Sequence, residues 1–134
     1  MASQSFFDVE HANREVKIVS GRISIGASGA PTVAEGLGFS IIGGSGSSLN
    51  AGQYRLTLDK TYTGFLFGGV EFNALGVTQF ALGRVLNHNV TGDKTINLEF
   101  RNYDDDASPD LEELLANSEF TFCLVLWDRD WETE

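Results

Sequence analysis

The sequence predicts an all-β fold, an antiparallel β-sandwich or jelly-roll-like barrel, from two observations. Short runs in which apolar and polar residues alternate recur from Val16 to Trp127, and Gly-rich or Asn/Asp-rich breaks separate them. No helical segments alternate with these runs, as an α/β fold would require. The clearest run is 53–58, where every second side chain is a large apolar one, as in a strand with one buried face: Tyr54, Leu56 and Leu58.

Seven strands, or eight, account for the chain at a spacing of roughly 10–15 residues. We expect them at 16–25, 37–42, 53–58, 65–72, 80–87, 94–103 and 118–128. The first strand changes parity at Ser20-Gly21, which predicts a bulge or break there, and 26–31 is a loop by composition. In the last run, 118–128, the side chains on both sides of the strand are largely apolar, which is typical of a strand covered on both sides.

One helical signal stands near 109–116, between the last two strands. Ser108 is a suitable N-cap, Pro109 suits the first helical position, and Asp110, Glu112 and Glu113 place negative charge in the first turn. We therefore expect one short helix in this segment.

The 134 residues correspond to one domain with two short extensions. Residues 1–14 form an N-terminal arm, 15–128 the β-sandwich domain and 129–134 an acidic C-terminal tail. The arm is polar except for Phe6, Phe7 and Val9, which pack either on their own domain or on a neighbouring subunit. Trp131 lies among charges and is a candidate for a contact made on assembly. These four residues are the predicted protein interface.

Net charge and hydropathy exclude several partners. The formal net charge of −10 opposes nucleic-acid binding, because phosphate backbones need a basic surface. No apolar run approaches the roughly 18 residues of a membrane span, so we expect no membrane partner. Residues 1–8 show neither the basic nor the apolar region of a signal peptide, so we expect synthesis in a cytoplasm. Cys123, the only cysteine, stands in an apolar strand and is expected to be a small buried hydrophobe.

Residues that could carry chemistry are few. His11 and His88 stand alone, without a nucleophile constellation or zinc spacing. The acidic segment 104–113 is either a cation site or a solvated loop, and its spacing differs from an EF-hand. We expect no catalytic residues, no metal site and no cofactor, so the protein is not expected to be an enzyme.

Several segments resemble small virion structural proteins of tailed phages, especially cyanophages and marine phages: 13–17, 36–40, 52–59, 94–98 and 120–126. The resemblance implies a capsid decoration (cement) protein on the virion surface, made in the host cytoplasm, with the major capsid protein as partner. Shell symmetry and the resemblance together suggest a homotrimer. The alternative is a head- or tail-fibre module that binds a receptor or sugar. The acidic tail lies outside the resembling pattern.

Overall fold

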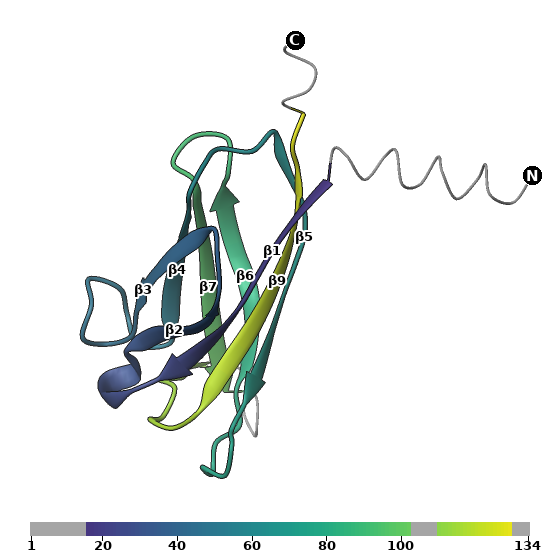
Figure 1. Cartoon of the computed structure of the whole chain (residues 1–134). Helices are drawn as coiled ribbons and strands as arrows, with labels where there is room; N and C mark the ends of the chain where they lie inside the picture. The colour runs from purple at the N-terminus through teal and green to yellow at the C-terminus, as the bar shows by residue number, and fades with distance from the viewer. Residues whose placement is uncertain (1–15, 103–109, 130–134) are drawn as a thin grey trace, which may run out of the picture.

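The computed structural model describes residues 16–102 and 110–129, which form two antiparallel sheets packed face to face (Figure 1). Sheet A has the order β2–β1–β9–β5, built from β2 (Pro31–Gly36), β1 (Val16–Ile25), β9 (Glu119–Trp127) and β5 (Gly64–Asn73). Sheet B has the order β3–β4–β7–β6, built from β3 (Phe39–Gly43), β4 (Gln53–Leu58), β7 (Thr95–Asn102) and β6 (Leu82–Asn89). The short β8 (Asp110–Leu111) pairs with β7. The predicted all-β sandwich is confirmed.

The core lies between the sheets and follows the predicted alternation. β4 buries Tyr54, Leu56 and Leu58 against the inner side of β9, whose buried residues are Phe120, Phe122, Leu124 and Leu126. The Tyr54 ring packs 5.2 Å from the Phe120 ring, centroid to centroid. Its hydroxyl donates a 2.6 Å hydrogen bond to the Gly29 carbonyl in the 3₁₀ turn η2 (Ala27–Gly29). Burial raises the pKa of the Tyr54 hydroxyl, so this group stays protonated.

The expected helix near 109–116 is wrong over its described part, residues 110–116. Asp110 and Leu111 form β8, and the following residues have no regular secondary structure. The Glu112 N–H donates to the Phe100 carbonyl at 2.9 Å, and Gln79 bonds the Glu113 carbonyl and the Leu115 N–H. The backbone groups that a helix would pair internally are therefore paired with β7 and Gln79. Tertiary partners outweigh a local helix signal that is only one or two turns long.

The bulge or break expected at Ser20-Gly21 is not found at that position, and β1 pairs with β9 without interruption from Val16 to Ser24. The irregularity in β1 lies against β2, between Arg22 and Ile23. Gly21 makes room for a neighbouring ring, because a Cβ at this position would lie 2.5 Å from Cζ of Phe39. The missing side chain lets the Phe39 ring pack edge-on against Phe122, with centroids 4.8 Å apart.

Strand β2 was not expected from the sequence. It is the edge of sheet A, and its residues after Pro31 are all exposed, so no buried parity marks it in the sequence. The ends of the sandwich domain are close together, since Val16 at the start of β1 is paired with Trp127 at the end of β9 (Figure 1). The predicted arm, 1–14, and the tail beyond residue 129 lie outside the described residues. No helix in the described part of the chain could cross a bilayer.

Candidate binding face on sheet A

The outward side of β9 is the first sign of a binding surface. β9 is a central strand of sheet A, and its inner parity fills the core. Its outward-facing residues are Glu119, Thr121, Cys123, Val125 and Trp127, and no described element packs over them. Within the described residues, the outer side therefore lacks the cover expected for this strand, and Cys123 is exposed rather than buried. The sandwich has two layers, so each sheet has one side without a covering layer.

Strand register aligns large apolar side chains across this outer side. Ile18 of β1 and Phe67 of β5 both lie opposite Val125 of β9. Ile18 is 66% exposed and Phe67 is 59% exposed. The neighbouring rung adds Val16 and Trp127, which are half-buried. We call these five residues the apolar ridge.

A hollow lies beside the apolar ridge, because the next rung contains only small residues, Ser20, Cys123 and Gly69. Two wide, shallow depressions open over this region, of about 450 Å³ and about 310 Å³. Both are lined by Thr121 and Phe122, so they meet at the middle of β9. The apolar ridge and the hollow give the face a raised and a recessed part, to which a partner surface can be complementary in shape.

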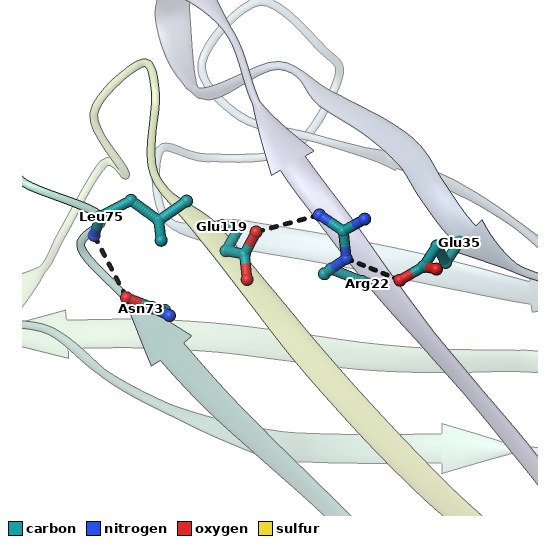
Figure 2. A network of polar contacts seen from close by, with 5 residues as sticks. All are labelled: Arg22, Glu35, Asn73, Leu75 and Glu119. Atoms are coloured by element: carbon teal, nitrogen blue, oxygen red, sulfur yellow. Dashed lines mark hydrogen bonds and ion pairs between the residues drawn. The ribbon is translucent and has the colours of Figure 1, made fainter.

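Charged residues close the other end of the face. Arg22 donates from Nε to Glu35 at 2.8 Å and from Nη1 to Glu119 at 3.2 Å, as Figure 2 shows. The hydrogen bond from Arg22 to Glu35 and that to Glu119 raise the pKa of the guanidinium above its usual value. With Glu71 opposite Thr121, one arginine and three glutamates leave this end a formal charge of −2. Nearby, the Leu75 N–H donates to the Asn73 side chain and closes the turn after β5 (Figure 2).

The described residues that could support catalysis are not brought together. His88 stacks on Phe65 with ring centroids 4.4 Å apart, on β6 and β5. Glu112 accepts from Gln79, and Glu113 accepts from the Ser45 N–H, so these two acids have separate partners. Among residues 16–102 and 110–129, no group of three or more His, Cys, Asp or Glu side chains could hold a metal ion. The geometry of the face suits docking of a surface.

The four residues predicted from the sequence as an interface, Phe6, Phe7, Val9 and Trp131, lie outside the described residues. The apolar ridge was missed, although one signal for it was present. The second apolar parity of 120–127 indicated a covered strand, and in a two-layer fold that cover must come from elsewhere. Comparison of the chain with protein-family models, curated proteins and solved structures gave no match.

Proposed function

We propose that this chain is a non-catalytic structural protein of a phage virion, a capsid decoration protein that binds the major capsid protein through the outer face of sheet A. The observation that supports this most is the apolar ridge, in which Ile18, Val125 and Phe67 stand in register on three strands. Contiguous exposed apolar surface on a soluble domain marks an interaction site more often than scattered single residues do.

The rigidity of the face supports docking. β9 is hydrogen-bonded along its length to β1 on one side and to β5 on the other. The inward-facing side chains of β9 pack in the core and hold the strand in place, for example Phe122 against Phe39. Side chains on such a strand keep their spacing, so little conformational entropy is lost when a partner surface covers them.

Magnitudes favour binding by several copies at once. Burying one large exposed apolar side chain contributes about 1.5–3 kcal/mol, and association costs roughly 4–15 kcal/mol. The ridge of a single copy therefore offsets little more than the cost of association. A homotrimer on the three-fold positions of a shell would engage several subunits together, and its sites would reinforce one another through effective concentration. The trimer rests on shell symmetry and on the resemblance to phage proteins.

The charged end of the face adds a salt-dependent component. Its formal charge of −2, within a chain of net charge −10, favours a basic patch on the partner. Salt screens exposed charges over about 8–10 Å, whereas contacts of the apolar ridge persist at high salt. Attachment to the shell is therefore expected to weaken in salt without being lost.

Cys123 provides a direct test, because it is an exposed thiol in the middle of the face. Maleimide labelling of Cys123 should slow at least about tenfold when the protein is bound to undecorated shells, because docking excludes the reagent. In the matched control, Cys123→Ser combined with Thr57→Cys moves the thiol to the outer face of sheet B, and its labelling should not change on binding. Unchanged labelling of Cys123 on shells with bound protein would exclude sheet A as the docking face.

The decoration role itself is tested by heating shells. A protein that binds only the assembled shell stabilises it by mass action, so decorated shells should rupture at a higher temperature than bare ones. Equal rupture temperatures, with the sites shown to be filled, would contradict the cement role and favour a fibre or receptor-binding role.

A further inference from the structure

The outer face of sheet B carries a different arrangement, a hydrogen-bonded row across three strands. Arg55 of β4 lies opposite Asn97 of β7, which lies opposite Asn87 of β6. Arg55 Nε donates to Asn97 Oδ1 at 3.0 Å, and Asn97 Nδ2 donates to Asn87 Oδ1 at 2.6 Å. Each amide orients the next group, so the half-buried Arg55 guanidinium is held in one direction.

Arg55 differs from three other arginines of the chain in its hydrogen-bond partners. Arg22, Arg84 and Arg101 all form ion pairs with glutamates. Within the described ranges, Arg55 has no carboxylate partner, and only its Nε is hydrogen-bonded. Its two terminal amino groups therefore keep their donors for an incoming group. A fixed guanidinium with free terminal donors matches a carboxylate in two-point geometry.

The row forms part of a depression of about 180 Å³ that is more enclosed than the hollows on sheet A. Gln53 adds a third amide to the polar lining, and Leu49 and Leu86 add apolar surface. Pockets for drug-sized ligands begin near roughly 300 Å³, so this depression accommodates a single small ring.

We propose that this depression binds a carboxylate-bearing sugar residue of the uronic acid type. The carboxylate pairs with the terminal amino groups of Arg55, ring hydroxyls exchange hydrogen bonds with Gln53, Asn87 and Asn97, and ring C–H groups pack on the two leucines. An acidic amino-acid side chain would use the guanidinium but leave the Gln53 amide and the remaining hydrogen-bonding groups of Asn87 and Asn97 unused. A neutral sugar would leave the guanidinium without an anion.

Electrostatics around the depression favour an anion. Next to the depression, Glu99 binds Arg84, which lies opposite it on β6, and Arg101, two residues along β7. With Arg55, three arginines and one glutamate give the described outer face of sheet B a formal charge of +2, in a chain of net charge −10. Anionic ligands are therefore attracted to this side of the molecule.

The test is an NMR titration of the purified full chain, without shells, so its outcome is independent of the decoration role. Glucuronate should bind with a millimolar dissociation constant, and glucose at least about tenfold more weakly, because a charge-assisted pair is lost. Arg55→Gln should weaken glucuronate binding by at least about tenfold. Asn97→Asp should do the same, because the new carboxylate pairs with Arg55 in place of the ligand. Lys17→Gln, which removes one positive charge from an exposed side chain on β1 of sheet A, is the matched control and should change binding by less than about twofold.

Three outcomes would overturn the proposal. The first is no saturable shift with glucuronate at tens of millimolar. The second is glucuronate binding that survives both Arg55→Gln and Asn97→Asp. The third is free glutamate binding as tightly as glucuronate, which would assign the depression to acidic side chains. Because Asn97→Asp preserves side-chain size, it tests the site even if Arg55→Gln fails to fold.

Discussion

The two outer faces of the sandwich differ although the same fold produces both. On sheet A, the outward side of the central strand β9 contributes to the apolar ridge at one end and to a charged region of formal charge −2 at the other. On sheet B, the outward side of the central strand β7 is polar, and its formal charge with the flanking arginines is +2. A central strand in a two-layer sandwich has one side that faces away from the core, and here these outward sides differ between β9 and β7.

The two faces differ in how far their exposed side chains have partners within the chain. Glu99, only 2% exposed, is held between Arg84 and Arg101 at 2.7–2.9 Å. The charged and amide side chains in the middle of sheet B's outer face are therefore hydrogen-bonded to one another, apart from the free end of Arg55. On sheet A, the most exposed ridge residues, Ile18 and Phe67, have no covering element among the described residues. We infer that sheet B contributes more to stability through its face, and sheet A more to association.

The largest effect is expected between the two sides of β9 itself. Phe122→Ala should lower the free energy of unfolding by about 3–5 kcal/mol, because it removes a buried ring and leaves a cavity beside Phe39. Val125→Ala, three residues along on the outer side, should cost less than about 1 kcal/mol. Denaturant unfolding measures both, and equal losses would mean that the outer side is covered in the free protein.

The next effect concerns Glu99. Glu99→Gln should cost about 2–3 kcal/mol at neutral pH, because it leaves two arginines facing each other without their anion. The hydrogen bond from Arg101, followed by that from Arg84, lowers the pKa of Glu99 against the opposing effect of burial.

The lowered pKa fixes the pH window of this contribution. A carboxyl whose folded pKa is depressed adds stability above its unfolded value, near 4.5, and that stability is lost as the pH falls through the folded pKa. The gap between wild type and Glu99→Gln should therefore be constant at neutral pH and shrink in acid below about pH 4. Unfolding curves across this range check it, and a gap that widens in acid would contradict the assignment.

Association should respond to the other face. Ile18→Asp should weaken docking on shells by about 10- to 100-fold, because it places a charge in the apolar ridge, while the unfolding midpoint stays unchanged. Thr57→Asp, which puts the same charge on sheet B, is the control and should dock normally. If both variants lose docking alike, net charge and not the ridge controls attachment.

The smallest effect is expected at the exposed ion pair between Arg22 and Glu35. The Arg22 side chain is 39% exposed and its partner Glu35 is 70% exposed, so solvent and salt screen this pair. Glu35→Gln should leave the unfolding midpoint unchanged within error at physiological salt, because Arg22 keeps its second partner, Glu119. A clear loss of stability there would show that the charged end of sheet A is structural, which would weaken the contrast with Glu99.

Strands in which every second side chain is buried were predictable from the sequence, and strands without that alternation were not. β4 was predicted at its observed limits because Tyr54, Leu56 and Leu58 alternate with polar residues. The exposed edge strand β2 carries no such signal and was missed. The predicted helix failed because Glu112 and its neighbours found hydrogen-bond partners on β7 and Gln79, which are remote in sequence.

The sequence by itself determined which side chains of a strand share a side, because alternation is a local property of extended backbone. Only the tertiary structure decided which side of 120–127 faces the core, since that depends on the number of layers. It also decided that Ile18, Phe67 and Val125 meet in one rung and that Arg55 meets Asn97 and Asn87 in another. Register between strands distant in the chain is set by packing and pairing across the whole sandwich. Both candidate surfaces are products of that register.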